Sequence, residues 1–186
     1  MVYLARGKRG IVHLIRREGT LVAVKSKKPG SQALRALENE AFWLKTLNRQ
    51  GIGPTFISLE DGNLIMGYIR GTPFVQWCAR HSLSAQKRVI GDIFRQCRIL
   101  DQTGVNKLEM HTPYKHIIVR KGKPVLLDFE RCRKTEKPKN VTQFCQFLLT
   151  LGYDVDHTAL RTLLEAYKRS YDEGIFHNIV SLFVGH

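Results

Sequence analysis

The chain has 186 residues, of which 43% are hydrophobic and 25% are charged, a composition typical of a folded globular protein. This length suits one domain or two small lobes with a hydrophobic core. The formal net charge of +14 favours phosphate-rich partners such as nucleotides, RNA or a ribosomal surface, although a solvated basic surface would give the same total.

Cysteine spacing and hydropathy indicate the cellular compartment in which the protein is expected. The four cysteines show neither CxxC spacing nor a metal-like spacing with histidine, which indicates reduced and mostly buried thiols. The first residues lack the basic and then apolar layout of a signal peptide, and no apolar run approaches the roughly 18 residues that cross a membrane. We therefore expect a soluble cytoplasmic protein that does not bind a membrane.

The N-terminal residues predict paired β-strands. Residues 11–15 and 21–24 alternate in polarity around a turn that contains a glycine. Ahead of the first strand, Gly7 and Gly10 would let the backbone approach phosphate oxygens closely, although two glycines are also common in hairpins that bind nothing. Lys25 ends the second strand, where its ammonium group would point into a bordering cleft or into water.

A helix is predicted from Ser31 to about residue 50, where Gly51 ends it. Its apolar stripe consists of Leu34, Leu37, Ala41, Leu44 and Leu47. Glu40 lies beside this stripe and can face inward to pair with Lys25. Glu38 is the competing partner, on a flank nearer to solvent. We prefer Glu40.

A polar, turn-rich segment from residue 66 to residue 74 separates two regions. Residues 1–70 are expected to form a strand-rich lobe with one main helix. Residues 71–186 are expected to be mostly helical, with helices near 84–104, 141–151, 156–171 and 176–183. The predicted fold class is α+β.

The stretch from residue 104 to residue 133 carries the most chemical information. A polar loop precedes two short apolar strands, at 117–119 and 124–127, which are joined by a Lys-Gly-Lys turn. The second strand runs into Asp128, and a carboxylate at the end of a buried strand is well placed to hold a metal ion. A surface hairpin followed by a solvated carboxylate is the alternative.

The chain contains six features in the order found in protein kinases. They are a glycine-containing hairpin, a lysine on a strand, a glutamate on a helix, a hinge, a polar loop and an aspartate after a strand. Over about residues 3–150 the chain resembles the eukaryotic-like protein kinase superfamily, specifically the small atypical kinases of the RIO type and the kinase of the KEOPS complex. It is most similar to an archaeal group of predicted Ser/Thr kinases. The residues that carry this closer resemblance are Glu40-Ala41 and the segments 51–54, 66–71 and 127–130.

The resemblance implies a two-lobed minimal protein kinase-like fold, with an antiparallel-sheet N-lobe and a reduced, mostly helical C-lobe. Lys25 would contact the phosphates of ATP, Glu40 would orient Lys25, and Asp128 would bind Mg²⁺, with Mn²⁺ as the alternative ion. Backbone groups of residues 66–69 would bind adenine. The nucleotide site that the resemblance implies comprises Gly7, Gly10, Val12, Ala23, Lys25, Glu40, Met66, Gly67, Tyr68 and Ile69.

The loop before residue 117 departs from the family pattern. The family has an aspartate as base and an asparagine five residues later as second metal ligand, and these positions hold His111 and His116 here. Glu109 can take the base position if the loop is two residues longer, so Glu109 and His111 both stay open. His116 is the metal candidate by position, although Mg²⁺ prefers oxygen ligands. Lys115 can neutralise developing phosphate charge and completes the catalytic set with Lys25.

These patterns predict an ATP- and Mg²⁺-dependent Ser/Thr protein kinase that transfers the γ-phosphate to a protein hydroxyl, including one of its own. The alternative is a catalytically impaired nucleotide-binding module that acts on a ribosome- or tRNA-related RNA–protein assembly, which the altered loop and the basic charge favour. A small-molecule phosphotransferase is disfavoured, because the short C-lobe leaves little material for a substrate pocket.

Overall fold

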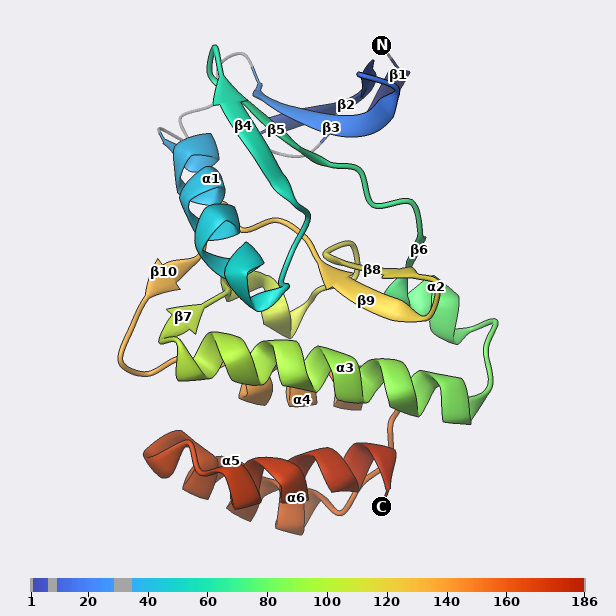
Figure 1. Ribbon diagram of the computed structural model, residues 1–186. Coiled ribbons are helices and arrows are strands. Elements are labelled where there is room, and N and C mark those ends of the chain that lie inside the picture. The colour runs from blue at the N-terminus through green and yellow to red at the C-terminus, as the bar shows by residue number, and fades with distance from the viewer. Residues whose placement is uncertain (1, 7–9, 29–34, 186) are drawn as a thin grey trace. The chain divides into compact units, whose positions relative to one another are not determined.

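The structure is a computed structural model that describes residues 2–6, 10–28 and 35–185. Helices make up 48% and strands 24% of the chain, which places it in the predicted α+β class. The chain divides into two compact units (Figure 1). The first comprises residues 1–71 and 125–132, and the second comprises residues 72–124 and 133–186.

The first unit is built on a five-stranded sheet in which all neighbouring strands pair antiparallel. The strands are β1 (Val2–Arg6), β2 (Gly10–Arg17), β3 (Thr20–Lys27), β4 (Phe56–Glu60) and β5 (Asn63–Gly67), in the order β1-β2-β3-β5-β4. The turn between β2 and β3 holds Glu18 and Gly19 with positive φ. This is the hairpin that the alternating residues predict.

Helix α1 (Ala36–Leu47) packs against this sheet through the predicted apolar stripe. Leu37, Leu44 and Leu47 are buried at the helical spacing. The helix begins after Arg35, while the predicted start at Ser31 lies outside the described residues. A 3₁₀ turn, η1 (Asn48–Gln50), follows α1 and ends at Gly51, as predicted.

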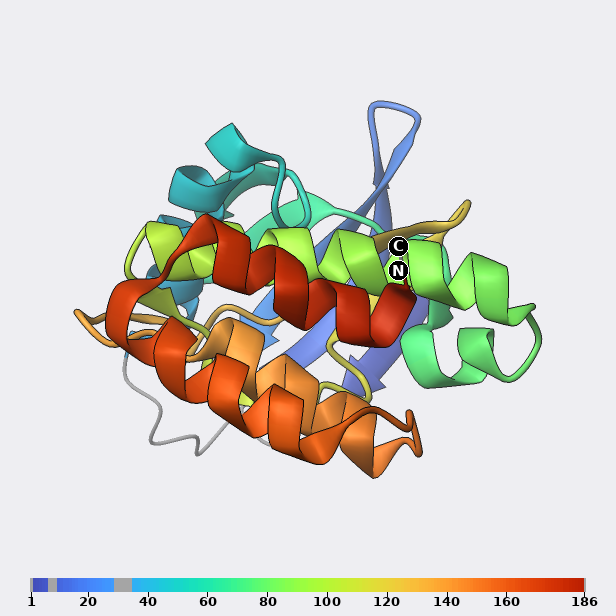
Figure 2. The same ribbon diagram turned by 90° about the horizontal axis from the view of Figure 1, so that it is seen from below.

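The second unit is mostly helical. Its longest helix is α3 (Leu83–Gln102), which contacts α4 (Asn140–Thr150) and α6 (Glu173–Val184), and α6 also contacts α5 (His157–Ser170) (Figure 2). The rings of Phe94 and Phe144 meet edge to face in the core, with their centroids 4.9 Å apart. Helix α2 (Phe74–Cys78) is short. None of the described helices is long and apolar enough to cross a membrane.

Short strands accompany these helices. A three-stranded sheet has the order β6-β8-β9, made of β6 (Thr72–Pro73), β8 (Ile117–Arg120) and β9 (Lys123–Leu126). The turn between β8 and β9 is the predicted Lys-Gly-Lys turn, with φ of 49° at Lys121 and 74° at Gly122. Strand β7 (Val105–Asn106) pairs with β10 (Arg133–Lys134), and the 3₁₀ turn η2 (Leu108–His111) lies between β7 and β8.

The helix boundaries differ from the predicted ones by a few residues. Ser82, and not Ser84, caps α3, because its hydroxyl accepts the N–H of Ala85 at 3.4 Å. Asp156 and Asp172 cap α5 and α6 in the same way. Strands β6, β7 and β10 and helix α2 are too short to produce a periodic signal, and the sequence does not predict them.

Candidate functional site

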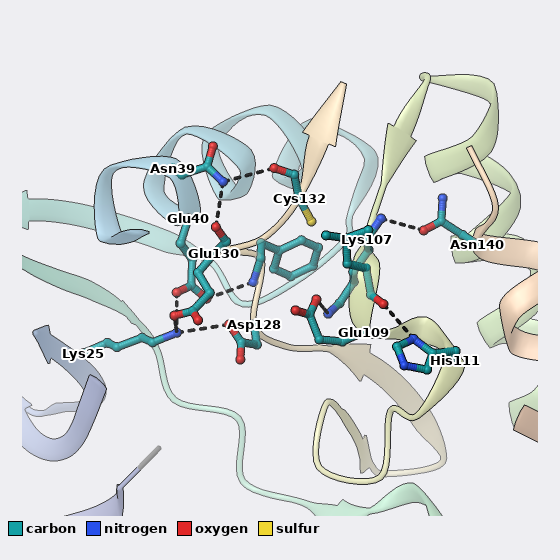
Figure 3. A network of polar contacts seen from close by, with 12 residues as sticks. Lys25, Asn39, Glu40, Lys107, Glu109, His111, Asp128, Glu130, Cys132 and Asn140 are labelled. Carbon is teal, nitrogen blue, oxygen red and sulfur yellow. Dashed lines mark hydrogen bonds and ion pairs between the residues drawn. The ribbon is translucent and has the colours of Figure 1, made fainter. Parts of the chain in front are cut away.

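Four charged side chains of the first unit meet at one point (Figure 3). Lys25 comes from β3, Glu40 from α1, and Asp128 and Glu130 from the segment that follows β9. The Nζ atom of Lys25 lies 2.6 Å from Oε2 of Glu40. It also lies 3.2 Å from a carboxylate oxygen of Asp128 and 3.2 Å from one of Glu130. We call these four residues the lysine–carboxylate cluster. It contains the predicted Lys25–Glu40 ion pair.

Burial sets the electrostatics of this cluster. The side chain of Glu40 is 1% exposed and that of Lys25 is 10% exposed. Burial by itself lowers the pKa of Lys25, but the charges of Glu40, Asp128 and Glu130 outweigh it and raise that pKa above the ordinary lysine value. Burial also raises the pKa of Glu40, and the ammonium of Lys25 opposes this effect. Lys25 is therefore held protonated, and the charge of Glu40 depends on it.

The local structure explains why these two side chains face each other. Ala23 and Lys25 lie two residues apart on β3 and point to the same buried face. Glu40 stands on α1 between Leu37 and Leu44, so that it points inward with the apolar stripe. Its second oxygen, Oε1, accepts the backbone N–H of Phe129 at 3.1 Å. Glu40 thus connects Lys25 to the segment that carries the other two carboxylates.

Helix α1 also holds the segment 128–132 through its polar side chains. The amide of Asn39 donates to the carbonyl oxygens of Glu130, at 2.8 Å, and Cys132, at 3.1 Å. The indole N–H of Trp43 donates to the same Cys132 carbonyl at 2.9 Å. Asp128 adopts a left-handed conformation with φ of 64°, which aspartate tolerates better than most residues.

The side chain of Phe129 anchors the segment 128–132 in the core of the first unit. Its ring is completely buried and lies against Gly53, which has φ of +83°. A Cβ atom at Gly53 would lie 2.9 Å from this ring and 2.9 Å from Leu44, so that only glycine fits here. The segment 51–54 belongs to the sequence resemblance to kinases, and this contact gives a physical reason for its second glycine.

A cavity of about 530 Å³ borders the cluster within the first unit, and Lys25 and Glu130 both line it. Lys27 and Arg35 contribute further positive charge to its wall, and Glu38 and Asp61 contribute negative charge. A Cβ atom at Gly10 would lie 3.1 Å from a backbone oxygen and 3.4 Å from the Lys25 side chain, so the glycine allows the hairpin to approach the lysine closely. The cavity therefore places a fixed ammonium group at the edge of a space whose wall carries charges of both signs.

The donor set of the cluster fits a hard divalent cation. Glu40, Asp128 and Glu130 each offer one carboxylate oxygen, and these oxygens all lie within 4.8 Å of one another. Mg²⁺ and Mn²⁺ prefer oxygen ligands. Three carboxylates carry more negative charge than the single ammonium group of Lys25 balances, and a divalent cation would offset the excess.

The other predicted nucleotide-site residues of the N-terminal hairpin lie near the cluster or outside the described chain. Gly7 lies outside the described residues. Val12 is opposite Lys25 in the register between β2 and β3. Ala23 is buried and pairs with Met66 of β5.

The predicted hinge begins inside the sheet. Met66 and Gly67 are the last residues of β5, and Tyr68 and Ile69 follow it, all four half-buried. The N–H of Gly67 already donates to the carbonyl oxygen of Thr55 at 2.8 Å. Tyr68 and Ile69 therefore suit the expected contact with adenine better than Gly67 does.

The remaining predicted catalytic residues belong to the second unit. Glu109 lies in η2 with its side chain 12% exposed, and its Oε2 atom is 3.7 Å from Nζ of the wholly buried Lys107 (Figure 3). His111 is exposed, and its Nδ1 atom lies 2.9 Å from the carbonyl oxygen of Leu108. Lys115 is exposed and His116 is half-buried. The structure thus gathers Lys25, Glu40 and Asp128 in the first unit and places Glu109, His111, Lys115 and His116 in the second.

A buried hydrogen-bond network holds the chain that leads into Glu109. The backbone N–H of Lys107 donates to Oδ1 of Asn140 at 2.8 Å, and the Asn140 amide donates to Asp101 at 2.7 Å. The Tyr167 hydroxyl donates to the other oxygen of Asp101 at 3.0 Å and accepts from Arg98 at 3.1 Å. Burial raises the pKa of Asp101, and the hydrogen bonds from Asn140 oppose this effect.

Sequence reasoning does not find this network, nor the contribution of Glu130 to the cluster. The available signals are an aspartate that continues the apolar stripe of α3 and an asparagine at the first position of α4. Both residues are buried polar groups, which proteins keep only when they are hydrogen-bonded.

No protein-family model and no curated protein matches the chain. The site itself is therefore the basis for assigning a function.

Proposed function

We propose that the first unit binds ATP with Mg²⁺, or with Mn²⁺ as the alternative, and that the protein is a minimal, two-lobed, kinase-like Ser/Thr phosphotransferase. The lysine–carboxylate cluster carries this proposal. A buried ammonium group is held protonated by three carboxylates beside a cavity that is lined by charged residues of both signs. The cavity volume of about 530 Å³ lies within the range of roughly 300–1,000 Å³ that small-molecule sites occupy.

Lys25 supplies a fixed positive charge for the phosphates of the nucleotide. Glu40 holds the ammonium group at 2.6 Å, so the side chain loses little freedom when an anion approaches. Gly10 lets the hairpin backbone come close to the same anion, because a Cβ atom would narrow the space next to Lys25.

Asp128 is the most accessible carboxylate of the cluster, with a side chain that is 29% exposed, against 9% for Glu130 and 1% for Glu40. We therefore assign Asp128 as the principal metal ligand and Glu130 as a second ligand, whereas Glu40 stays paired with Lys25. These carboxylates would hold the ion, which would supply positive charge to offset that of the nucleotide phosphates.

Transfer to a hydroxyl group calls for a residue that accepts a proton or positions the acceptor. We assign this role to Glu109. The acceptor oxygen bonds to the γ-phosphorus, the bond from that phosphorus to the bridging oxygen breaks, and the hydroxyl proton passes to the Glu109 carboxylate. The exposed Lys115 can offset negative charge on the transferred group.

One observation favours a second candidate function, a catalytically impaired nucleotide-binding module that acts on an RNA–protein assembly. Nζ of the wholly buried Lys107 lies 3.7 Å from Oε2 of Glu109, so this carboxylate already faces a cation of its own unit in the place of an acceptor hydroxyl. The net charge of +14 is suited to phosphate-rich RNA.

Titration calorimetry with ATP and Mg²⁺ tests nucleotide binding. Lys25→Ala and Asp128→Ala should abolish binding, whereas Lys168→Ala and Asp154→Ala, two exposed positions of the second unit, should leave it unchanged. Circular dichroism confirms that each variant is folded, and Asp128→Asn replaces Asp128→Ala if the latter is not. Unchanged nucleotide affinity in both cluster variants would sink the proposal.

A transfer assay separates the two candidates. For a kinase, Glu109→Gln should reduce phosphate transfer much more than it reduces ATP affinity. If the wild-type protein binds ATP but transfers no phosphate to itself or to a basic protein, the module is the better assignment. An RNA affinity that falls steeply with salt would support it further.

A further inference from the structure

The second unit contains a groove that none of the predicted site residues lines. It lies between α3 and α6 and has a volume of about 690 Å³. Its α3 side is a stripe at helical spacing that includes Lys87, Arg88, Gly91 and Arg95, and its α6 side includes Val180 and Val184. Figure 2 shows α6 running along α3.

The two walls of the groove differ in chemistry. Val180 and Val184 are only half-buried, although they extend the apolar face on which α6 packs. On the α3 side, Lys87 and Arg88 are exposed and form no ion pair with any residue that the structure describes. Arg95 pairs with Asp92 of the same helix. The α6 wall therefore combines two half-buried valines with the buried Phe176 and the exposed His177, and the α3 wall carries uncompensated positive charge.

Gly91 keeps the groove open. It lies in the interior of α3, where glycine makes a helix less stable than alanine would. No packing contact requires it, because a Cβ atom at this position would meet nothing within 4 Å. Between the long side chains of Arg88 and Arg95, the absence of a side chain leaves space for a ligand.

The length of the groove matches a short helix. The lining residues of α3 extend from Ser84 to Arg95, about 16 Å at 1.5 Å per residue, and those of α6 extend over about 12 Å. This is roughly two to three helical turns. An amphipathic helix can place its apolar stripe on Val180 and Val184 and its acidic residues along Lys87 and Arg88.

We propose that the α3–α6 groove docks an acidic amphipathic helix of a partner protein. A single-stranded nucleic acid fits less well, because bases stack on exposed aromatic rings. Of the two rings that line the groove, Phe176 is buried, and Nε2 of the exposed His177 lies 3.6 Å from the Glu173 carboxylate, which repels phosphate groups. The proposal does not rest on nucleotide binding by the first unit, because all lining residues belong to the second.

A fluorescein-labelled synthetic peptide of about 14 residues, with leucines at helical spacing and glutamates on the other face, is the probe. We expect saturable binding to the full chain by fluorescence anisotropy. The double variant Lys87→Glu/Arg88→Glu and the variant Gly91→Trp should each weaken binding at least about tenfold. Gly91→Ala should bind within about twofold of wild type, because its methyl group enters open space.

Two controls distinguish docking in the groove from general attraction to a basic protein. Lys168→Glu/Arg169→Glu reverses two exposed charges on α5 and should bind like wild type. A scrambled peptide of the same composition should bind at least about tenfold more weakly. No binding to wild type, equal binding by all variants, or equal binding of the scrambled peptide would overturn the proposal. So would an oligouridylate of similar length that displaces the peptide and binds Gly91→Trp as well as wild type, because the surface would then recognise RNA by charge alone.

Discussion

Replacing Lys25 with methionine removes the only ammonium group of the lysine–carboxylate cluster while keeping a side chain of similar length. Glu40 and Glu130, whose side chains are almost fully buried, then lose their counter-charge. The contact with Asp128 counts for less, because water screens its partly exposed carboxylate. Removing one partner of a buried ion pair costs about 3–5 kcal/mol. We expect this loss at neutral pH, out of a total stability of about 5–15 kcal/mol for a typical domain.

The pH dependence gives the same prediction a second readout. Without Lys25, the pKa of Glu40, which burial already raises, rises further because the cation that opposed this effect is gone. As the pH falls from 7 towards the ordinary glutamate pKa of 4.5, Glu40 therefore takes up a proton in the folded variant before it does so in the unfolded chain. This raises the free energy of unfolding of the variant towards that of wild type. On the alkaline side the pKa of Lys25 is raised, so the wild-type advantage is fully present below the ordinary lysine pKa of 10.5 and is lost only as the pH rises through the higher folded value.

Urea denaturation in a Trp77→Phe background measures this loss, because the fluorescence of Trp43 then reports on the first unit alone. Lys27→Met is the matched control, since it removes an exposed lysine from the end of the same strand and should cost at most about 0.5 kcal/mol. If Lys25→Met is as stable as Lys27→Met at pH 7, the three carboxylates are not held as ions around a buried ammonium group.

Two further predictions concern packing and thiol chemistry. Gly53→Ala combines a positive φ with contacts of 2.9 Å to two side chains, so it should lower the free energy of unfolding by about 2–5 kcal/mol. Gly51→Ala has a positive φ but nothing within 4 Å and should cost only about 1–2 kcal/mol. Thermal and urea unfolding measure both values. Burial raises the pKa of Cys97 and Cys145, so iodoacetamide at pH 8 should leave both thiols unmodified in the native protein. The half-buried Cys78 should react slowly. If peptide mapping finds Cys97 or Cys145 alkylated as fast as Cys78, their burial is contradicted.

The helical stripes and the β2–β3 hairpin could be predicted from the sequence because they depend on local periodicity. The choice of Glu40 over Glu38 follows from the same periodicity, since Glu40 stands between two buried leucines of α1 and Glu38 is exposed. An inward-facing glutamate then has to find a cation, and Lys25 is the inward-facing lysine of the adjacent strand.

Contacts between distant segments leave no periodic trace. Asn39 and Glu130 meet across 91 residues of sequence, and Asp101 and Asn140 across 39. The polar side chains that make these contacts stand beside apolar residues, and the sequence alone cannot tell them from solvated residues. The carboxylate of Glu130 likewise joins the cluster without any local signal, whereas Asp128 is expected there because it directly follows the predicted strand 124–127.

A radiolabelled-ATP assay on wild type, Asp128→Ala and Glu109→Gln tests the central claim most directly. We predict that wild type transfers labelled phosphate to itself or to a basic protein substrate. Asp128→Ala should lose both nucleotide binding and transfer, and Glu109→Gln should retain binding and lose most of the transfer. Label transfer that is equal in all three proteins would contradict the assignment of the lysine–carboxylate cluster and of Glu109 to phosphoryl transfer.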